Sequence, residues 1–338
     1  MTISPSPALA GRILVIRSGA LGDFILTLPA IRALREAWPE ARLDIIGKPA
    51  VVELAHGRYY ADAVRSIDRA DLIPLFTPDP RPSPELAAYL RGLDLLLSYL
   101  PDRDGLFLRN LEKVGVKRIV FGNALPADGE DMHITDQLSE PVEGIGIAVR
   151  DRVPRVFLSA EDNQKAEEFL VAEGIRGSDL LFAVHPGSGG ARKCWAPDRF
   201  AKVADEVGRA TGAKVLIPCG PADEQAVAGM VPAMSFAPAV ARDLPLPVLG
   251  ALLARCGAYL GNDSGVTHLA AATGASAVAL FGPTDPRVWG PRGENVRVLQ
   301  GNPSLAGEQR LESISVEQVF QVVREVLGLR RGNRAGPA

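Results

Sequence analysis

Apolar runs alternate with amphipathic stretches along residues 11–150 of this chain. The runs have the length and the branched, apolar composition of buried parallel strands, and the segments between them repeat apolar residues at helical spacing. Strands that alternate with helices form a mostly parallel sheet with right-handed crossovers. A stretch rich in proline and aspartate, residues 68–84, is predicted to be a surface loop. The predicted strands are residues 13–16, 43–46, 93–97 and 118–121, and predicted helices cover residues 85–91 and 105–114.

A second alternating series follows a charged stretch at residues 150–159, where we place a domain boundary. Ser159 and Asp162 predict a capped helix that ends near residue 173. The fold class is therefore predicted to be α/β, with two Rossmann-like domains, residues 11–150 and 159–312, facing each other across a cleft. The strands predicted for the second domain are residues 180–184, 214–217, 258–260 and 276–281, with helix faces at residues 200–207 and 249–253.

The C-terminal segment, residues 313–329, is predicted to be a helix. Ser315 and Gln318 form a capping box, and apolar residues from Val316 to Leu327 lie on one stripe. Packing of this stripe against the N-terminal domain is one option that the pattern leaves open. The tail after Leu329 and the first 11 residues are expected to be disordered or frayed.

Composition narrows the functional classes. The 338 residues are 47% hydrophobic and 23% charged, with a formal net charge of -3, so no general attraction to nucleic acid or anionic lipid is expected. No window approaches the roughly 18 apolar residues of a membrane span. Cys194, Cys219 and Cys256 lack the paired spacing of disulfide frameworks or metal sites, which favours a reducing compartment and no metal. We expect a cytoplasmic protein with at most peripheral contact with the inner face of the cytoplasmic membrane.

The turn after the first predicted strand carries one acid. Gly19 and Gly22 break the apolar run, Asp23 follows, and helical spacing resumes, with Pro29 expected in or near a first helical turn. Ligands of open α/β sheets bind beyond the carboxyl ends of the strands. Asp23 is therefore a candidate for acid–base chemistry.

Three turns in the second half also join a strand to a helix. The first runs from His185 to Trp195, where glycines allow close backbone approach and Ser188, Arg192 and Lys193 offer contacts to phosphate oxygens, although the spacing is not that of a Walker A loop. An acid such as Glu224, after the next strand, suits ribose hydroxyls. The third turn, residues 261–268, places free N–H groups at a helix start, which is typical of an anion site.

Each of these features also has a purely structural interpretation. Glycine-rich turns occur throughout α/β proteins, Asp23 and Asp263 are able to cap helices, and His268 fits a hydrogen-bonded core position equally well. Lys193 fits a solvent-facing position. The functional interpretation gains weight because all four turns fall at predicted strand ends.

The same turns resemble the ADP-heptose:lipopolysaccharide heptosyltransferases, glycosyltransferase family nine. The matching segments are residues 19–31, His185-Pro-Gly-Ser188 with Lys193-x-Trp195, and residues 262–271 with residues 281–285. The resemblance extends from about residue 11 to 330. It implies the GT-B fold and an inverting sugar transfer, without an essential metal or other cofactor, from a nucleotide diphosphate held by the C-terminal domain.

The resemblance also implies roles for individual residues. Asp23 matches the general base that takes the proton of the acceptor hydroxyl, and it would lie across the cleft from the phosphate loops. The implied donor-binding residues are Ser188 and Lys193 at the phosphates, Glu224 at the ribose, Leu246 at adenine, Asp263 at the donor sugar, and Ser264, Gly265, Val266, Thr267 and His268 as the diphosphate cradle. The implied partners are ADP-heptose and a lipid-linked or glycan acceptor such as lipopolysaccharide.

One departure from the family concerns the acceptor. Lipopolysaccharide heptosyltransferases tend to carry basic residues in the N-terminal domain, whereas residues 68–85 here contain acids and prolines, with Arg69 and Arg81 as the basic residues. Other cations that fit an acceptor site or a solvated face are Arg103, Arg109, Lys113, Lys117 and Arg118. Two alternatives therefore stand beside a heptosyltransferase: a family member using another nucleotide sugar for a different glycan, and a non-catalytic sugar-nucleotide-binding protein.

Overall fold

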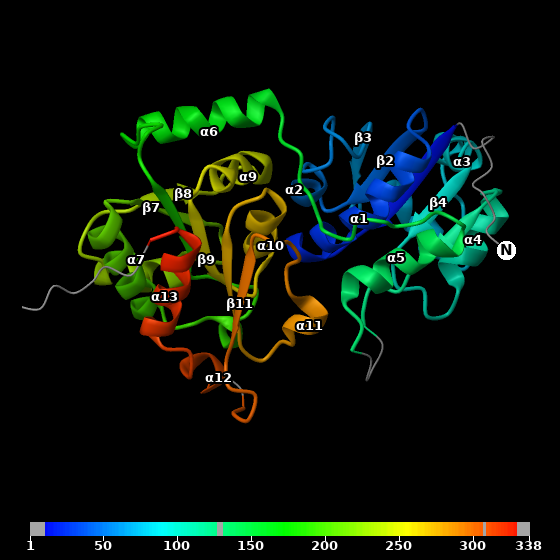
Figure 1. The fold of residues 1–338 in the computed structure, drawn as a ribbon. Helices are drawn as coiled ribbons and strands as arrows, with labels where there is room; N and C mark the ends of the chain where they lie inside the picture. The colour runs from blue at the N-terminus through cyan, green and yellow to red at the C-terminus, as the bar shows by residue number, and fades with distance from the viewer. Residues whose placement is uncertain (1–10, 127–130, 307–308, 330–338) are drawn as a thin grey trace, which may run out of the picture. The chain divides into compact units, whose positions relative to one another are not determined.

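The computed structural model describes residues 11–126, 131–306 and 309–329, so the predictions for most of the N-terminal tail and for the tail after Leu329 lie outside the described residues. The chain divides into two compact units between Ser159 and Ala160, with the short segment Arg287–Trp289 grouped with the first unit. Each unit contains one parallel sheet covered by helices (Figure 1). The predicted α/β class with two Rossmann-like domains is confirmed.

The first unit is built on a five-stranded sheet in the order β3-β2-β1-β4-β5, parallel at every pairing. The chain passes from β1 to β3 on one side and then returns to β4 and β5 on the other. The topological switch point of this sheet, where the chain changes from one side of the first strand to the other, therefore lies between β1 and β4. The strands are β1 Arg12–Arg17, β2 Arg42–Gly47, β3 Ala63–Ser66, β4 Leu95–Ser98 and β5 Ile119–Phe121; the helices are α1 Leu21–Ala37, α2 Pro49–Val52, α3 Pro84–Arg91, α4 Leu106–Val114 and α5 Ile134–Gly144.

Two predictions for the first unit were wrong. Pro29 lies in the middle of α1, because the helix already begins at Leu21; burial of Phe24, Ile25 and Leu28 compensates for the backbone hydrogen bond that proline cannot make. The stretch at 68–84 is not only a surface loop, since it contains the 3-10 helix η1, Ala70–Phe76. Leu72 and Leu75 of η1 are buried in the core of this unit, which local composition did not indicate.

The second unit is built on a six-stranded parallel sheet in the order β11-β10-β9-β6-β7-β8. Its switch point lies between β6 and β9. The strands are β6 Leu181–His185, β7 Lys214–Cys219, β8 Ala239–Arg242, β9 Ala258–Asn262, β10 Ala277–Phe281 and β11 Val296–Gln300; the helices are α6 Ala160–Ala172, α7 Pro197–Thr211, α8 Glu224–Met230, α9 Leu246–Ala254, α10 Gly265–Ala272, α12 Gln309–Glu312 and α13 Val316–Val326, with the 3-10 turns η2 Ala191–Lys193 and η3 Val231–Ala233. Helix α11, Pro286–Trp289, follows β10 in the chain and contains the segment Arg287–Trp289 that is grouped with the first unit.

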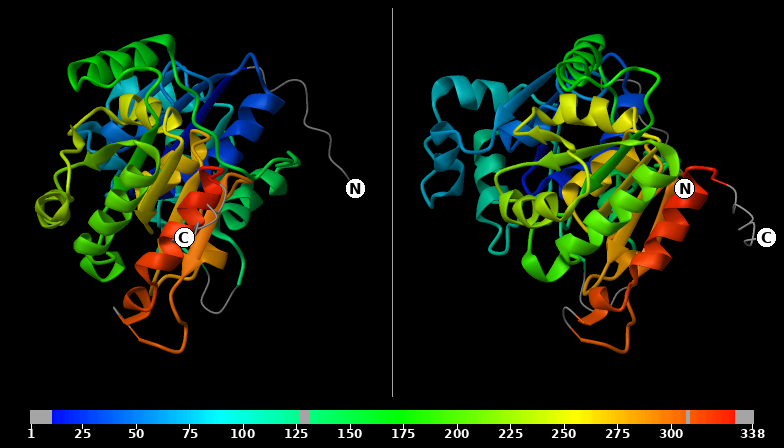
Figure 2. Two further views of the ribbon diagram at one scale, coloured as in Figure 1. Left: turned by 60° about the vertical axis from the view of Figure 1, so that its left-hand side comes forward. Right: turned by 90° about the vertical axis from the view of Figure 1, so that its left-hand side faces the viewer.

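The last helix, α13, packs on the second unit. It lies beside α7 (Figure 2), and its buried residues Val319 and Val323 join the same core cluster as Phe200. The predicted capping box is present, with Ser315 and Gln318 each bonded to the backbone of the other. The apolar stripe of α13 therefore covers the sheet of its own unit.

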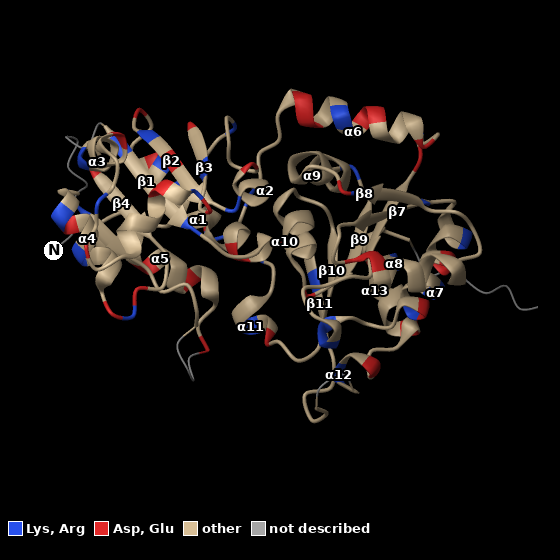
Figure 3. Ribbon diagram, turned by 180° about the vertical axis from the view of Figure 1, so that it is seen from behind, with Lys and Arg blue, Asp and Glu red and all other residues tan. Residues whose placement is uncertain are grey.

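The distribution of charged and apolar residues over the helices agrees with the expectations from the composition. In Figure 3 acidic and basic residues are interspersed along the helices of each unit, and α6 carries both signs. Among the described residues, no helix has the length and apolar content needed to cross a membrane.

Candidate functional site

Four neighbouring strands of the second sheet deliver the predicted donor-binding residues to one edge. In sheet order, Asp263 follows β9, Ser188 and Lys193 follow β6, Glu224 follows β7 and Leu246 follows β8. Because the strands are parallel, all of these turns lie at the carboxyl edge. The loops after β6 and β9 flank the switch point, where open α/β sheets form their ligand crevice.

Lys193, Ser188 and Asp263 form one polar cluster at the switch point. The Lys193 Nζ atom lies 2.7 Å from Oδ2 of Asp263, whose side chain is 9% exposed. The Ser188 hydroxyl donates to the backbone carbonyl of Asp263 at 2.6 Å. The lysine side chain itself is 39% exposed. One face of the ammonium is therefore held by a carboxylate, and the other remains open to an anionic ligand.

The start of α10 provides backbone donors beside this cluster. Ser264 is the N-cap, and its Oγ accepts from the backbone N–H of Thr267 at 3.3 Å. The Thr267 hydroxyl donates to the carbonyl of Asn262 and lies 3.0 Å from the hydroxyl of Tyr259. These buried contacts fix the first turn of α10. The positive end of its dipole and its unpaired first N–H groups thus face the same edge as Lys193.

Asn262 joins the two loops. Its Oδ1 accepts from the backbone N–H of Trp195 at 2.9 Å, and its Nδ2 donates to the carbonyl of Pro186 at 2.8 Å. The indole N–H of Trp195 donates to the carbonyl of Ile314 at 3.1 Å. This bond gives the tryptophan a structural role at the end of the turn that carries Lys193. Asn262 is fully buried, so both bonds are made away from water.

We expect Asn262→Ala to lower the free energy of unfolding by about 2–4 kcal/mol, because it leaves the Trp195 N–H and the Pro186 carbonyl buried without partners. Urea unfolding followed by tryptophan fluorescence measures this loss. Asn302→Ala is the matched control, since Asn302 is exposed and its side chain accepts from the backbone N–H of Ser304, two residues along the same turn. Equal stability of the two variants would contradict the prediction.

The remaining predicted donor-binding residues differ in how far they are exposed to solvent. Glu224 is exposed and forms an ion pair with Arg242, which lowers the pKa of the glutamate. Leu246 begins α9 and is partly buried. Gly265 and Val266 are partly exposed at the start of α10, whereas His268 is buried within it. Within the part of the chain that the structure describes, no side-chain hydrogen bond or ion pair joins Glu224 or Leu246 to the Lys193 cluster.

A buried pair at this edge was missed by the sequence analysis. The Nε2 atom of His185 lies 3.2 Å from Oδ2 of Asp223, and Nδ1 lies 3.3 Å from the Ser264 hydroxyl. Burial alone would raise the pKa of Asp223, but the imidazole and the backbone N–H of Gly220 hold it below its ordinary value. A histidine as the last residue of a buried strand was the signal available in the sequence.

In the first unit, Asp23 lies at the switch point between β1 and β4. Its Oδ2 accepts from the backbone N–H of Ala20 at 2.7 Å, so it does cap α1. Its Oδ1 lies 3.8 Å from the guanidinium of Arg17, and the aspartate side chain is 31% exposed. The cap thus uses one carboxylate oxygen, and the group as a whole remains accessible.

Arg17 and Gly19 hold Asp23 in place. Arg17 donates to the Asp23 carbonyl at 3.2 Å and to the Thr27 hydroxyl at 2.9 Å, and its guanidinium lies over the ring of Tyr99. Burial lowers the pKa of Arg17, and the Asp23 carboxylate acts in the opposite direction. Gly19 has a φ of +128°, and a Cβ there would come within 2.7 Å of the Asp23 carboxylate. Glycine is therefore required for this turn.

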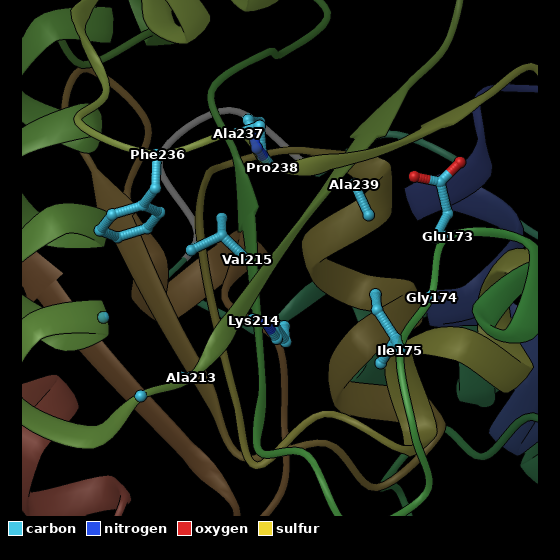
Figure 4. A pocket seen from close by; sticks show the side chains of 12 residues that line it. Glu173, Gly174, Ile175, Ala213, Lys214, Val215, Phe236, Ala237, Pro238 and Ala239 are labelled. Atoms are coloured by element: carbon cyan, nitrogen blue, oxygen red, sulfur yellow. The ribbon is translucent and has the colours of Figure 1, made fainter.

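A groove and a pocket lie outside the clusters around Lys193 and Asp23. The groove, of about 520 Å³, lies at the carboxyl edge of the first sheet, between residues 100–105 after β4 and residues 121–125 at and after the end of β5. Another pocket, of about 400 Å³, lies where β7 and β8 begin, with Phe236 and Lys214 in its wall (Figure 4). This second pocket is at the amino edge of its sheet, away from the donor-binding turns, and we assign it no part in the site.

Known proteins match both the sequence and the fold. Residues 124–317 match the family model of glycosyltransferase family 9 (heptosyltransferase). Lipopolysaccharide heptosyltransferase 3 of Escherichia coli K12 is 28% identical, over 81% of this chain and 83% of that protein.

Two solved structures share the fold. The family 9 glycosyl transferase of Veillonella parvula has a TM-score of 0.80 at 24% identity, over 94% of this chain and 98% of that one. The E. coli ADP-heptose LPS heptosyltransferase II has a TM-score of 0.75 at 19% identity, over 94% and 98%. With the family model covering more than half of the chain, this protein belongs to glycosyltransferase family 9, the heptosyltransferases, and is a glycosyltransferase of GT-B fold.

Proposed function

We propose that this enzyme transfers heptose from ADP-heptose to a lipopolysaccharide or related glycan acceptor. The observation that carries the proposal is the anion site at the switch point of the second sheet, where Lys193, Ser188 and the N-terminus of α10 converge. This site suits the diphosphate of a nucleotide sugar. Relatives named as lipopolysaccharide heptosyltransferases support heptose and this class of acceptor.

The proposed reaction is a single displacement with inversion and without an essential metal. Asp23 accepts the proton of the acceptor hydroxyl, whose oxygen then bonds to the anomeric carbon of the donor sugar. The bond from that carbon to the diphosphate oxygen breaks, and ADP leaves with the electron pair. Lys193 and the N–H groups at the start of α10 stabilise the negative charge that develops on the leaving group.

The donor has to compete with two ion pairs of the free protein. Asp263, proposed to meet the donor sugar, is paired with Lys193, and Glu224, proposed to meet the ribose, is paired with Arg242. Each ion pair uses one carboxylate oxygen, so the other oxygen of Asp263 and of Glu224 can accept a hydrogen bond from a sugar hydroxyl of the donor. Leu246, one strand beyond Glu224 in the sheet, is proposed to contact adenine, and His268 with Gly265, Val266 and Thr267 to complete the cradle.

The groove after β4 and β5 is the proposed acceptor site. It lies on the same sheet edge as Asp23, and Tyr99, which precedes the groove residue Leu100, lies under the Arg17 guanidinium. Arg103 lines the groove, and no hydrogen bond or ion pair of its side chain is recorded within the described residues. A lipid-linked acceptor would bring the enzyme to the inner face of the cytoplasmic membrane as a peripheral protein.

A binding screen tests the donor. We expect calorimetry to show ADP and ADP-heptose binding at least about tenfold more tightly than UDP, GDP or dTDP and their sugars, since Leu246 is proposed to contact adenine. Preference for a non-adenine donor would favour the alternative of another nucleotide sugar. Tight donor binding with no transfer to any glycan acceptor would instead favour a non-catalytic binding protein.

A further inference from the structure

His185 stands directly behind the proposed diphosphate cradle. It is the last residue of β6, its ring is 1% exposed, and it lies between the carboxylate of Asp223 and the hydroxyl of Ser264. The two ring nitrogens face these groups at 3.2 Å and 3.3 Å, respectively. The ring is too deeply buried to touch a ligand, so any effect on the donor has to pass through a neighbouring group, Ser264 or Asp223.

The neighbours of the ring select the tautomer of the neutral imidazole. Nε2 is the nitrogen beside the Asp223 carboxylate, where a proton is favoured by the negative charge; the contact is electrostatic, because Nε2 makes no well-directed hydrogen bond. With the proton on Nε2, the neutral ring presents the lone pair of Nδ1 to Ser264. The Ser264 hydroxyl can then donate to Nδ1, in competition with the Thr267 hydroxyl oxygen 3.1 Å away, and it accepts from the backbone N–H of Thr267.

The direction of the Ser264 hydroxyl matters because this residue caps α10. A hydroxyl whose proton is held by His185 keeps its lone pair toward the N–H of Thr267. The N–H groups of Gly265 and Val266 then remain available for an anion. An Nδ1 acceptor therefore directs the Ser264 hydroxyl at the first turn of α10.

We propose that His185 is a positioning residue for donor binding, which acts by holding the Ser264 hydroxyl in the orientation that the diphosphate cradle requires. This inference rests on the proposed function, since it assumes that the start of α10 binds the donor diphosphate. It differs from a packing role, because it depends on which ring nitrogen is replaced and not on the volume of the side chain.

Two amide substitutions separate these roles. Asn places its amide near the position of Nδ1, and Gln places its amide near the position of Nε2. We expect H185N to bind ADP within about threefold of the wild type and H185Q to bind about tenfold more weakly, as the loss of one buried hydrogen bond implies. The KM of the donor should rise in H185Q, while the KM of the acceptor and the melting temperatures of the two variants stay similar.

A double-variant cycle shows whether His185 acts through Ser264. If it does, H185Q/S264A should bind ADP no more weakly than S264A alone, because the partner of Nδ1 is already missing. Additive losses would overturn the inference. Equal ADP affinity of H185N and H185Q would also overturn it, whereas a wild-type protein that binds no ADP would overturn the proposed donor and this inference together.

The tautomer of His185 can also be measured directly in the wild-type protein. The chain has four histidines, so imidazole nitrogen–proton NMR correlations are few, and the absence of one set in H185N assigns His185. We expect a proton on Nε2 and none on Nδ1 at pH 8. A proton on Nδ1 would contradict the proposed hydrogen bond from Ser264.

Discussion

Asp23→Asn is expected to lower the rate of sugar transfer by about 10²–10⁴-fold while leaving ADP affinity nearly unchanged. The amide oxygen of Asn can still accept from the backbone N–H of Ala20, so the cap of α1 should survive. What the substitution removes is the ability to take a proton from the acceptor hydroxyl. A transfer assay with saturating donor and acceptor measures the rate, and calorimetry with ADP measures the affinity.

The same variant tests the structural interpretation of Asp23. Loss of the negative charge beside Arg17 is expected to cost about 1 kcal/mol, or a few degrees in the melting temperature. Asp179→Asn is the matched control, because Asp179 also accepts from a backbone N–H, that of Arg176 at 2.9 Å, and lies away from the site. A D23N enzyme with near wild-type turnover would exclude Asp23 as the base, and a variant that does not fold would make it structural.

Lys193→Ala is expected to weaken ADP binding and to slow transfer by about ten- to a hundredfold. The ammonium is proposed to make a charge-assisted contact with the diphosphate, worth roughly 1.5–3 kcal/mol. Its removal also leaves the mostly buried carboxylate of Asp263 without its cation, beside an anionic ligand. Calorimetry with ADP and steady-state kinetics of the donor measure the two effects.

Two companion variants make this result specific. Lys202→Ala is the matched control, since Lys202 pairs with Asp198 at 2.8 Å on the exposed face of α7, and its ADP affinity should equal that of the wild type. Adding Asp263→Asn to Lys193→Ala should recover part of the lost ADP affinity, because it removes the uncompensated negative charge. Unchanged donor binding in K193A would return Lys193 to a solvent-facing role.

The central strands were predictable from local sequence because they are buried on both faces. The strand predicted at 13–16 appears as β1, Arg12–Arg17, and that predicted at 214–217 appears as β7, Lys214–Cys219. Three of the four edge strands, β3, β8 and β11, were missed, whereas the fourth, β5, was predicted at 118–121. Apart from Ala239 and Ala241 of β8, the residues of the missed strands are partly or fully exposed, and these strands mix polar and apolar side chains.

The turns that carry the candidate site were also visible in the sequence. Glycine and hydroxyl residues after an apolar run mark a strand-to-helix turn, and the residues 185–195 and 261–268 do occupy such turns after β6 and β9. Family membership could likewise be inferred from these motifs and is confirmed by the family model. The roles of the individual site residues stay predictions until the variants are measured.

What the sequence determined by itself is thus the chemistry of each turn, because it depends on residue types at short separation. Only the tertiary structure decided which side chains meet. Lys193 and Asp263 are 70 residues apart, and His185 and Ser264 are 79 apart, yet each pair is in contact. They meet because β6 and β9 are neighbours in the sheet, and strand order depends on packing over the whole unit, which no local pattern records.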